Sequence, residues 1–269
     1  MNRLAYKFKG SGHEVPEEKR KYVVRRYTLL PAFEAWHVYM EKCFEPSMKG
    51  DAMVWKWDEY YKKAEEMLKG INATPDEANA LQFLSKEHAF TGYFGLFLSA
   101  VYNKSKEKTI IFDGDRVCML GYKLKKSKTL INTGSVDFNS GLKAEGIVVN
   151  LGKAGGGFCL ASRGIAINLG EVREHFASRS SGIAINYGKA DYSMAKAATG
   201  IVIAAKEPTN FEKTESAKVL READIVRYPE LGKFLDDLKE KVELAREKKT
   251  SLSLHRIKKS IEDILKRTA

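Results

Sequence analysis

Between residues 128 and 206 the sequence repeats itself every 18 residues. Each unit opens with a short β-branched run, and the successive runs occupy residues 147–149, 165–167, 183–185 and 201–203. A fixed period of this size is typical of a solenoid, in which each repeat is one structural unit stacked on the previous one. The repeat therefore constrains the fold more strongly than any other feature of the chain.

Three columns of apolar residues recur in these units, which predicts a parallel β-helix with three short faces per turn. The first and third residues of each run, such as Ile147 and Val149, are expected to point inward. A second inward column is Val136, Ala154, Val172 and Ala190, and a third is Phe158, Phe176 and Met194. Glycines recur at two corners of the coil, where close approach or a positive φ is needed.

One asparagine occupies the same position of four successive units: Asn132, Asn150, Asn168 and Asn186. Stacked asparagines hydrogen-bond to one another and to the turn backbone, so the row is interpreted as a structural ladder. The alternative is a polar row that binds a ligand or ion. The row stops at Ala204 and the corner glycine becomes Lys206, so the solenoid is predicted to end there.

The stretch GIVVNLGKAGGGFCLASRGIAINLG (146–170) resembles the glycine-rich repeats of the right-handed β-helix in glutamate synthase large subunits and formylmethanofuran dehydrogenase. This resemblance, over about residues 128–206, implies a structural spacer and no active-site residues. The left-handed hexapeptide helix of acyl- and sugar-nucleotide transferases is another solenoid with the same period. That helix has three six-residue segments per turn. Here only the first two segments of a unit begin with glycine, so the handedness of the solenoid is left open.

The predicted fold class is α+β, a parallel β-solenoid flanked by helices. Its parts are a basic N-terminal arm (1–30), a helical region (31–104), the solenoid with entry strands (105–206) and C-terminal helices (207–269). Thr74 and Pro75 predict the start of one long helix to about Tyr102. An Asp-Gly turn at 113–114 predicts a pair of entry strands, or an irregular first rung. Helices are predicted over 213–226, from Pro229, and over 253–267 as an antiparallel hairpin.

The net charge of +11 is unevenly distributed along the chain. Residues 1–30 and 102–128 each carry a net charge of +5, whereas residues 31–101 carry −4. This pattern permits nucleic-acid binding, with phosphates contacted by Arg25, Arg26, Lys125 and Lys126. Alternatively, the basic arm covers the acidic helices of its own chain.

No apolar stretch is long enough to span a bilayer, and the first residues lack a signal-peptide core, so a cytoplasmic location is expected. The three cysteines lie far apart, which predicts neither a zinc site nor a disulfide framework. No phosphate-binding loop or dinucleotide motif occurs, and no metal or other cofactor is expected.

The only histidine in the repeats is His175, with Glu171 or Glu174 as its candidate general-base partner. Arg163, Arg173 and Arg179 lie on the same or adjacent rungs and form a candidate anion site. The first functional prediction is a noncatalytic scaffold that binds a protein partner or self-associates. The alternatives are a trimeric hexapeptide-type transferase that uses His175, and a basic nucleic-acid-binding protein.

Overall fold

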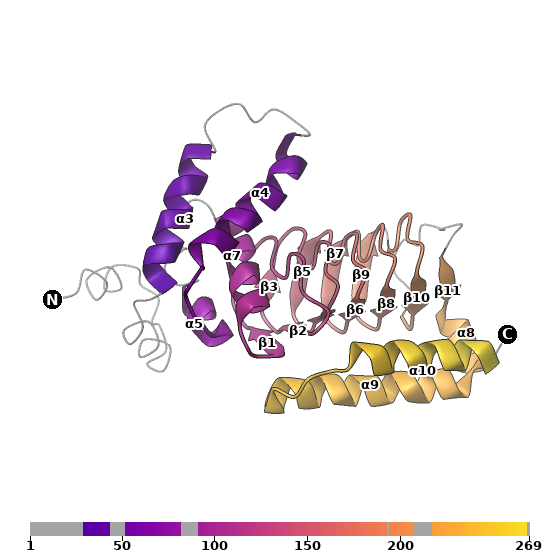
Figure 1. The fold of residues 1–269 in the computed structure, drawn as a ribbon. Coiled ribbons are helices and arrows are strands. Elements are labelled where there is room, and N and C mark those ends of the chain that lie inside the picture. The colour runs from indigo at the N-terminus through magenta and orange to yellow at the C-terminus, as the bar shows by residue number, and fades with distance from the viewer. Residues whose placement is uncertain (1–28, 44–51, 82–90, 193, 207–216, 268–269) are drawn as a thin grey trace.

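The computed structural model describes residues 29–43, 52–81, 91–192, 194–206 and 217–267. It confirms the α+β class: N-terminal helices, a parallel β-solenoid and C-terminal helices follow one another along the chain (Figure 1). The N-terminal helices are α3 (Leu29–Cys43), α4 (Ala52–Met67), α5 (Pro75–Ala80) and α7 (Thr91–Lys104).

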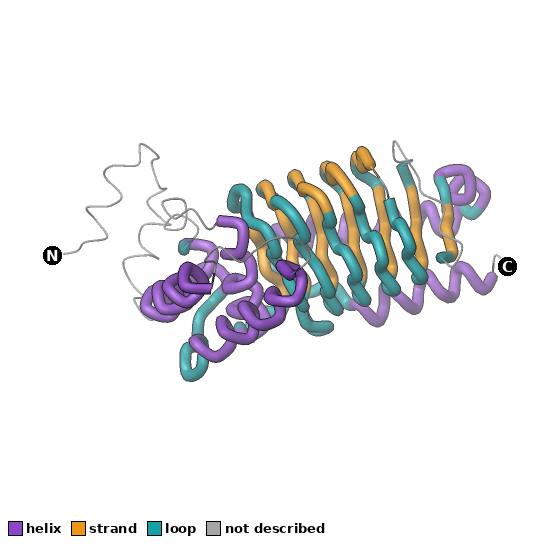
Figure 2. The backbone as a smooth tube through the Cα atoms, turned by 90° about the horizontal axis from the view of Figure 1, so that it is seen from above, coloured by secondary structure: helices purple, strands orange, loops and turns teal. Residues whose placement is uncertain are grey.

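Two parallel sheets form two sides of the solenoid (Figure 2). The seven strands of sheet A are β1 (Thr109–Phe112), β2 (Thr129–Asn132), β4 (Ile147–Asn150), β6 (Ile165–Asn168), β8 (Ile183–Asn186), β10 (Ile201–Ala204) and β11 (Lys218–Leu220). The four strands of sheet B are β3 (Ser135–Val136), β5 (Lys153–Gly156), β7 (Glu171–Glu174) and β9 (Lys189–Tyr192). Register pairs such as Ile147 with Ile165 confirm the 18-residue rung.

The third side, here called the turn face, consists of the segments 119–127, 139–145, 157–163, 175–181 and 194–199. Each of these segments contains alternate residues with a positive φ, in the left-handed region of backbone conformation, such as Cys159 (φ 58°) and Ala161 (φ 52°). The N–H of Cys159 donates to the carbonyl of Ser140 on the preceding rung (2.7 Å), and that of Ala161 donates to Ser178 on the following rung (2.8 Å). Backbone hydrogen bonds to both neighbouring rungs therefore connect this side of the solenoid as well as the two sheets.

The interior of the solenoid differs from the prediction in one of its three columns. The middle residues of the sheet A strands point inward: Leu130, Val148, Ala166, Ala184 and Val202. They meet the second and third predicted columns, in which Phe158 and Phe176 stack at 6.0 Å between ring centroids. The first and third residues, such as Ile165 and Ile167, point outward. The prediction was wrong because both sides of sheet A are buried, so alternation alone does not identify the inner side.

The outer surface of sheet A is covered by the C-terminal helices, α8 (Glu222–Arg227), α9 (Pro229–Lys248) and α10 (Leu254–Arg267). Leu231, Leu235 and Leu238 of α9 and Ile261 of α10 pack with the outward isoleucines in one cluster. The predicted hairpin is thus confirmed. At its tip, Lys249 forms an ion pair with Asp76 (2.9 Å) and reaches the N-terminal helices.

At the N-terminal end, the alternative of a first rung is the correct one of the two predictions, because β1 pairs with β2 in parallel, Thr109 with Thr129. The predicted C-terminal end needs correction. There β11 pairs with β10, so sheet A extends beyond Lys206, and residues 218–220 are a strand where a helix was predicted. Helix α5 ends at Ala80, short of the single helix predicted to Tyr102.

The asparagine row is a structural ladder, as predicted. Each amide nitrogen donates to the amide oxygen of the next asparagine, at 2.8 Å from Asn132 to Asn150 and 2.9 Å from Asn150 to Asn168. The last member, Asn186, donates to the carbonyl of Lys206 at 2.9 Å. The corner glycines serve close approach: a Cβ on Gly152 would lie 1.9 Å from the carbonyl oxygen of Gly134. All four asparagines are fully buried, so the row is unavailable to a ligand.

Helix α7 closes the N-terminal end of the solenoid, where no earlier rung exists to accept or donate hydrogen bonds. The hydroxyl of Ser99 accepts from the N–H of Tyr122 at 3.0 Å. A Cβ on Gly95 would lie 2.0 Å from the carbonyl oxygen of Cys118, so the helix touches the first rung directly. Polar side chains of α7 therefore replace the missing backbone of a preceding rung.

Candidate functional site: a basic turn face

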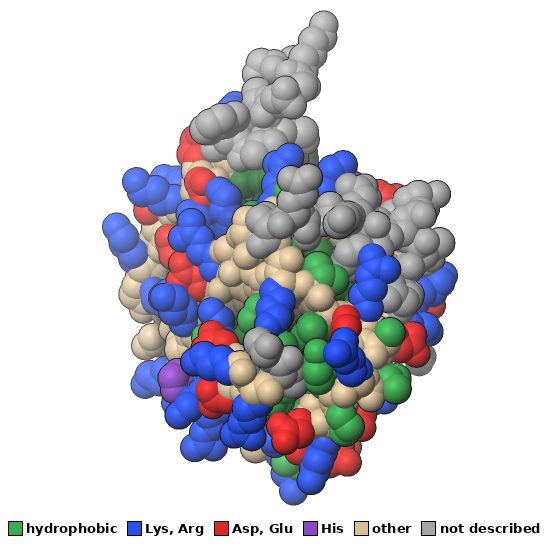
Figure 3. Space-filling model, turned by 90° about the vertical axis from the view of Figure 1, so that its right-hand side faces the viewer, with side chains coloured by type: hydrophobic (Ala, Val, Ile, Leu, Met, Phe, Trp, Pro, Cys, Tyr) green, Lys and Arg blue, Asp and Glu red, His purple; other side chains and the backbone are tan. Residues whose placement is uncertain are grey.

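The exposed side chains of the turn face are predominantly basic. Seven Lys or Arg residues and one acidic residue, Glu145, lie on its segments. The basic residues are Lys123, Lys125, Lys126, Lys143, Arg163, Arg179 and Lys196, all of them exposed. Viewed from the C-terminal end of the solenoid, Lys and Arg side chains crowd the left-hand side of the molecule (Figure 3).

Backbone hydrogen bonds place these residues in columns that follow the solenoid axis. Lys123 donates to Leu142 at 3.0 Å and Lys143 to Leu160 at 3.0 Å, so equivalent positions stack from rung to rung. Arg179 donates to Lys196 at 2.7 Å in the same column, two rungs beyond Lys143. Rungs are about 4.8 Å apart, so five rungs extend the basic surface over about 19 Å.

The side chain of Asn103, from α7, holds the first basic segment in place. Its amide nitrogen donates to the carbonyl of Lys123 (3.1 Å), and its amide oxygen accepts from the N–H of Lys125 (2.9 Å). The same nitrogen donates to the hydroxyl of Tyr61 (2.8 Å). The buried side chain of Asn103, rather than water, thus satisfies backbone groups of the segment that carries Lys123 to Lys126.

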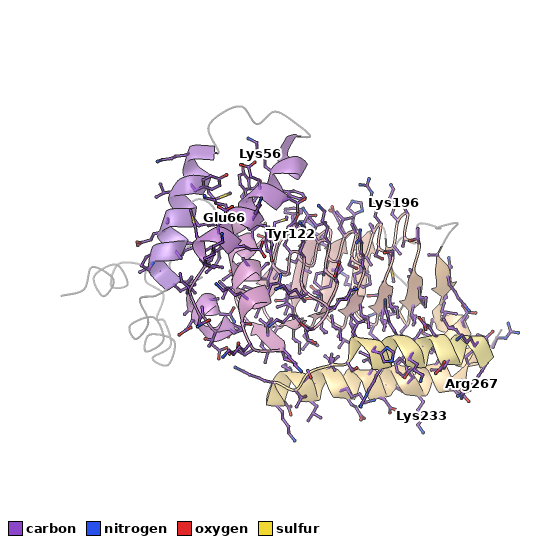
Figure 4. The ribbon with its side chains drawn as sticks, viewed as in Figure 1. Lys56, Glu66, Tyr122, Lys196, Lys233 and Arg267 are labelled. Carbon is purple, nitrogen blue, oxygen red and sulfur yellow. The ribbon has the colours of Figure 1, made fainter. Side chains whose placement is uncertain are left out.

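One end of the face is partly neutralised by Asp58 of α4. The carboxylate lies 2.5 Å from Lys123 Nζ and 3.0 Å from Lys143 Nζ, and it accepts from the Tyr122 hydroxyl at 2.6 Å. Partial burial raises the pKa of Asp58, but these three donors outweigh it and hold the pKa well below its usual range. Tyr122 lies where α4 meets the first rung (Figure 4), and burial raises the pKa of its hydroxyl.

Four of the remaining basic side chains have no oppositely charged partner among the described residues. Lys125, Lys126, Arg163 and Arg179 form no ion pair within the part of the chain that the structure describes. Lys196 projects from the solenoid into solvent near its C-terminal end (Figure 4). Four unpaired positive charges on one surface repel one another. An anionic partner bound there would reduce this repulsion.

Sheet B can be compared directly with the turn face. The charges of its outward side chains alternate in sign from one strand to the next. Lys153 pairs in register with Glu171, and Glu171 with Lys189, so each charge is flanked by its opposite. Such a column is close to neutral and stabilises the sheet locally. The excess of positive charge therefore belongs to the turn face and is not spread evenly over the solenoid.

An exposed aromatic side chain lies at the border between sheet B and the turn face. Phe138 is 58% exposed, although its residue type is usually buried. A Cβ on Gly156 would lie 3.2 Å from its ring, so the phenyl group rests against a glycine of the next rung. A flat, exposed ring beside basic side chains is the combination that holds unpaired nucleobases.

The predicted catalytic residues do not form a cluster. His175 and Glu171 are exposed, and His175 makes no side-chain hydrogen bond or ion pair among the described residues. Glu174 lies 4.0 Å from Arg173, its neighbour on β7. Of the predicted arginine site, Arg163 and Arg179 share the turn face, whereas Arg173 lies on sheet B.

The predicted nucleic-acid residues divide in the same way. Lys125 and Lys126 belong to the turn face, and Arg25 and Arg26 lie outside the described residues. Lys128, counted as part of the same basic segment, is buried and donates to the carbonyls of Ser105 and Glu107, both at 2.6 Å. Its burial lowers its pKa, and it contributes nothing to the surface.

Sequence reasoning missed Lys123, Lys143, Lys196 and Phe138 as members of this surface. A signal was present, because the 18-residue period aligns Lys143 with Arg179 two units later. Comparison with known proteins finds no matching protein family, no similar curated protein and no similar solved structure. None of the described helices is long and apolar enough to cross a membrane.

Proposed function

We propose that this protein is a noncatalytic scaffold that binds nucleic acid on its turn face. The observation that supports this proposal is the sign of the exposed charge on that face, seven basic side chains against one acidic. The phosphate backbone supplies most of the binding energy in such complexes, through the release of condensed counterions. The role is that of a binding platform, and no chemical step is assigned to it.

The dimensions of the face fit a short segment of one strand. Its length of about 19 Å spans roughly six phosphates at the axial rise of B-form DNA, and fewer phosphates of a more extended single strand. Lys125 and Arg163 lie on rungs that the solenoid holds at fixed separation. Because the lumen is packed and the asparagine ladder is continuous, the backbone positions that carry these cations are fixed before the partner arrives, so only side chains must be ordered on binding.

Phe138 favours single-stranded over duplex nucleic acid. A base can stack on an exposed ring only when it is unpaired, and such stacking contributes about 1–3 kcal/mol per base. The ring is at one border of the turn face, and Lys125 and Arg163 are at the other border, next to sheet A. A strand crossing this face would contact both kinds of side chain.

Fluorescence anisotropy with labelled single-stranded oligonucleotides tests the proposal. The test variant replaces Lys125, Lys126, Arg163 and Arg179 by Gln, and we expect it to bind at least about tenfold more weakly in low salt. The matched control replaces Lys233, Lys248, Lys259 and Lys266 by Gln on the C-terminal hairpin, which removes the same charge. Lys233 projects from the opposite side of the molecule (Figure 4).

The two variants separate a binding face from a general effect of net charge. Equal weakening by both would show that only the total charge matters, and unchanged affinity of the test variant would contradict the proposal. Because all eight side chains are exposed, both variants are expected to keep the thermal midpoint of the natural protein. Phe138→Ala should weaken single-strand binding and leave duplex binding unchanged.

A further inference from the structure

The C-terminal hairpin contains a cavity that the proposed function does not use. It has a volume of about 280 Å³ and lies between α9, α10 and the loop that joins them. It belongs to the hairpin that covers sheet A, and none of its lining residues belongs to the turn face. The site is therefore independent of the basic surface described above.

The walls of this cavity combine an apolar interior with two cations. Phe234, Leu244 and Leu252 contribute apolar surface, and Leu244 is 43% exposed. Lys241 and Arg256 contribute the charge, and neither forms an ion pair among the described residues. The remaining polar lining residues carry hydroxyl groups, and no acidic side chain lines the cavity.

The volume limits the size of an occupant. An apolar cavity of about 150 Å³ accommodates benzene, so 280 Å³ accommodates a ring or chain of about twice that size. Ligand sites usually combine apolar walls with a few polar groups that fix the orientation of the ligand. Here those groups are two cations, Lys241 and Arg256, and their charge selects an anion over a neutral molecule.

We infer that this cavity binds a small amphipathic carboxylate, an apolar chain or ring of about ten non-hydrogen atoms ending in a carboxyl group. The apolar part lies against Phe234, Leu244 and Leu252. The carboxylate is held by Arg256, whose guanidinium can donate two parallel hydrogen bonds, and by Lys241. The acidic residues of α9 that include Glu240 and Glu243 lie in the neighbouring hollow, around the far side of Leu244.

Octanoate and 1-octanol provide a matched pair of probes, which differ in charge and share the apolar chain. Isothermal titration of the full chain should give a dissociation constant below about 1 mM for octanoate, and binding at least tenfold weaker for octanol. Arg256→Gln and Lys241→Gln should each weaken octanoate binding about fivefold. Lys259→Gln, an exposed lysine of α10 outside the cavity, should leave it unchanged.

Leu244→Trp gives a second test that does not depend on charge, because the larger ring fills the cavity and should abolish octanoate binding. Absence of octanoate binding at millimolar concentration would overturn the inference. So would equal affinity for octanol, or an effect of Lys259→Gln as large as that of Arg256→Gln. Loss of nucleic-acid binding in the turn-face variants would not affect any of these outcomes.

Discussion

A single carboxylate, Asp58, connects helix α4 with two turns of the solenoid. It contacts Lys123 and Lys143 on successive rungs and accepts a hydrogen bond from Tyr122. Its side chain is 46% exposed, so solvent screens the ion pairs. We expect Asp58→Asn to lower the free energy of unfolding by about 1 kcal/mol at neutral pH.

The pKa of Asp58 also predicts a pH dependence. Its folded-state pKa lies below the unfolded value of about 3.9, so its contribution is fully present above that pH. The contribution is lost as the pH falls from there toward the folded-state pKa. Urea unfolding of both proteins at pH 7 and pH 3 checks this, because the difference between them should shrink at low pH.

Asp115→Asn is the control for this pH dependence, since Asp115 is an exposed carboxylate that makes no ion pair among the described residues. It should match the natural protein in stability at pH 7. A difference between Asp58→Asn and the natural protein that stays constant down to pH 3 would contradict the assigned ion pairs.

Single residues also show where sequence reasoning ended. Asn150 shares its side of β4 with Val148, two positions earlier, and a buried ladder on that side would have identified the inner surface. The positive charge of Lys128 is visible in the sequence, but its burial is not, because the carbonyls of Ser105 and Glu107 approach it only in the fold. Period and composition are local properties, whereas burial depends on distant segments.

Among the elements, helix α7 caps the N-terminal end of the solenoid, and its Gly95 packs directly against the backbone of the first rung. A Cβ there would lie 2.0 Å from the Cys118 carbonyl oxygen, and the backbone cannot yield cheaply. We expect Gly95→Ala to destabilise the fold by about 1–3 kcal/mol. Differential scanning calorimetry or chemical unfolding measures this.

A second helical glycine is the matched control. In Gly232→Ala of α9 the new Cβ would meet the Ile225 side chain at 3.6 Å, an ordinary contact. Alanine has the higher helix propensity, so this variant should be about 0.5–1 kcal/mol more stable than the natural protein. If both substitutions raised the stability, α7 would not be a tightly fitted cap.

The pairing of elements was the part that the sequence did not reveal. The apolar stripe of α9, with Leu231 and Leu238, was evident, and so was a hairpin with α10. Its partner, the outer surface of sheet A, is formed by residues such as Ile165 that had been assigned to the interior. The hairpin was thus predicted without its partner surface, because no local pattern shows which of two apolar surfaces of a sheet a helix covers.

At the scale of the whole molecule, the three sides of the solenoid have different tasks. Sheet A is covered by the hairpin, sheet B carries charges of alternating sign, and the turn face carries positive charge on successive rungs. Helix α7 closes the N-terminal end of the solenoid and the C-terminal hairpin covers sheet A, so the turn face remains exposed. This division predicts that partner binding depends on charge and little on total apolar area.

The salt dependence of single-strand binding tests this account most directly. For about four phosphate contacts, the logarithm of the association constant should fall with the logarithm of salt concentration with a slope near −3. The variant lacking Lys125, Lys126, Arg163 and Arg179 keeps three basic residues of the turn face and should have a slope of about −1 or shallower, and the hairpin control should keep the full slope. An association constant that does not change with salt concentration would contradict the claim that the turn face binds nucleic acid. So would a turn-face variant with the same slope as the natural protein.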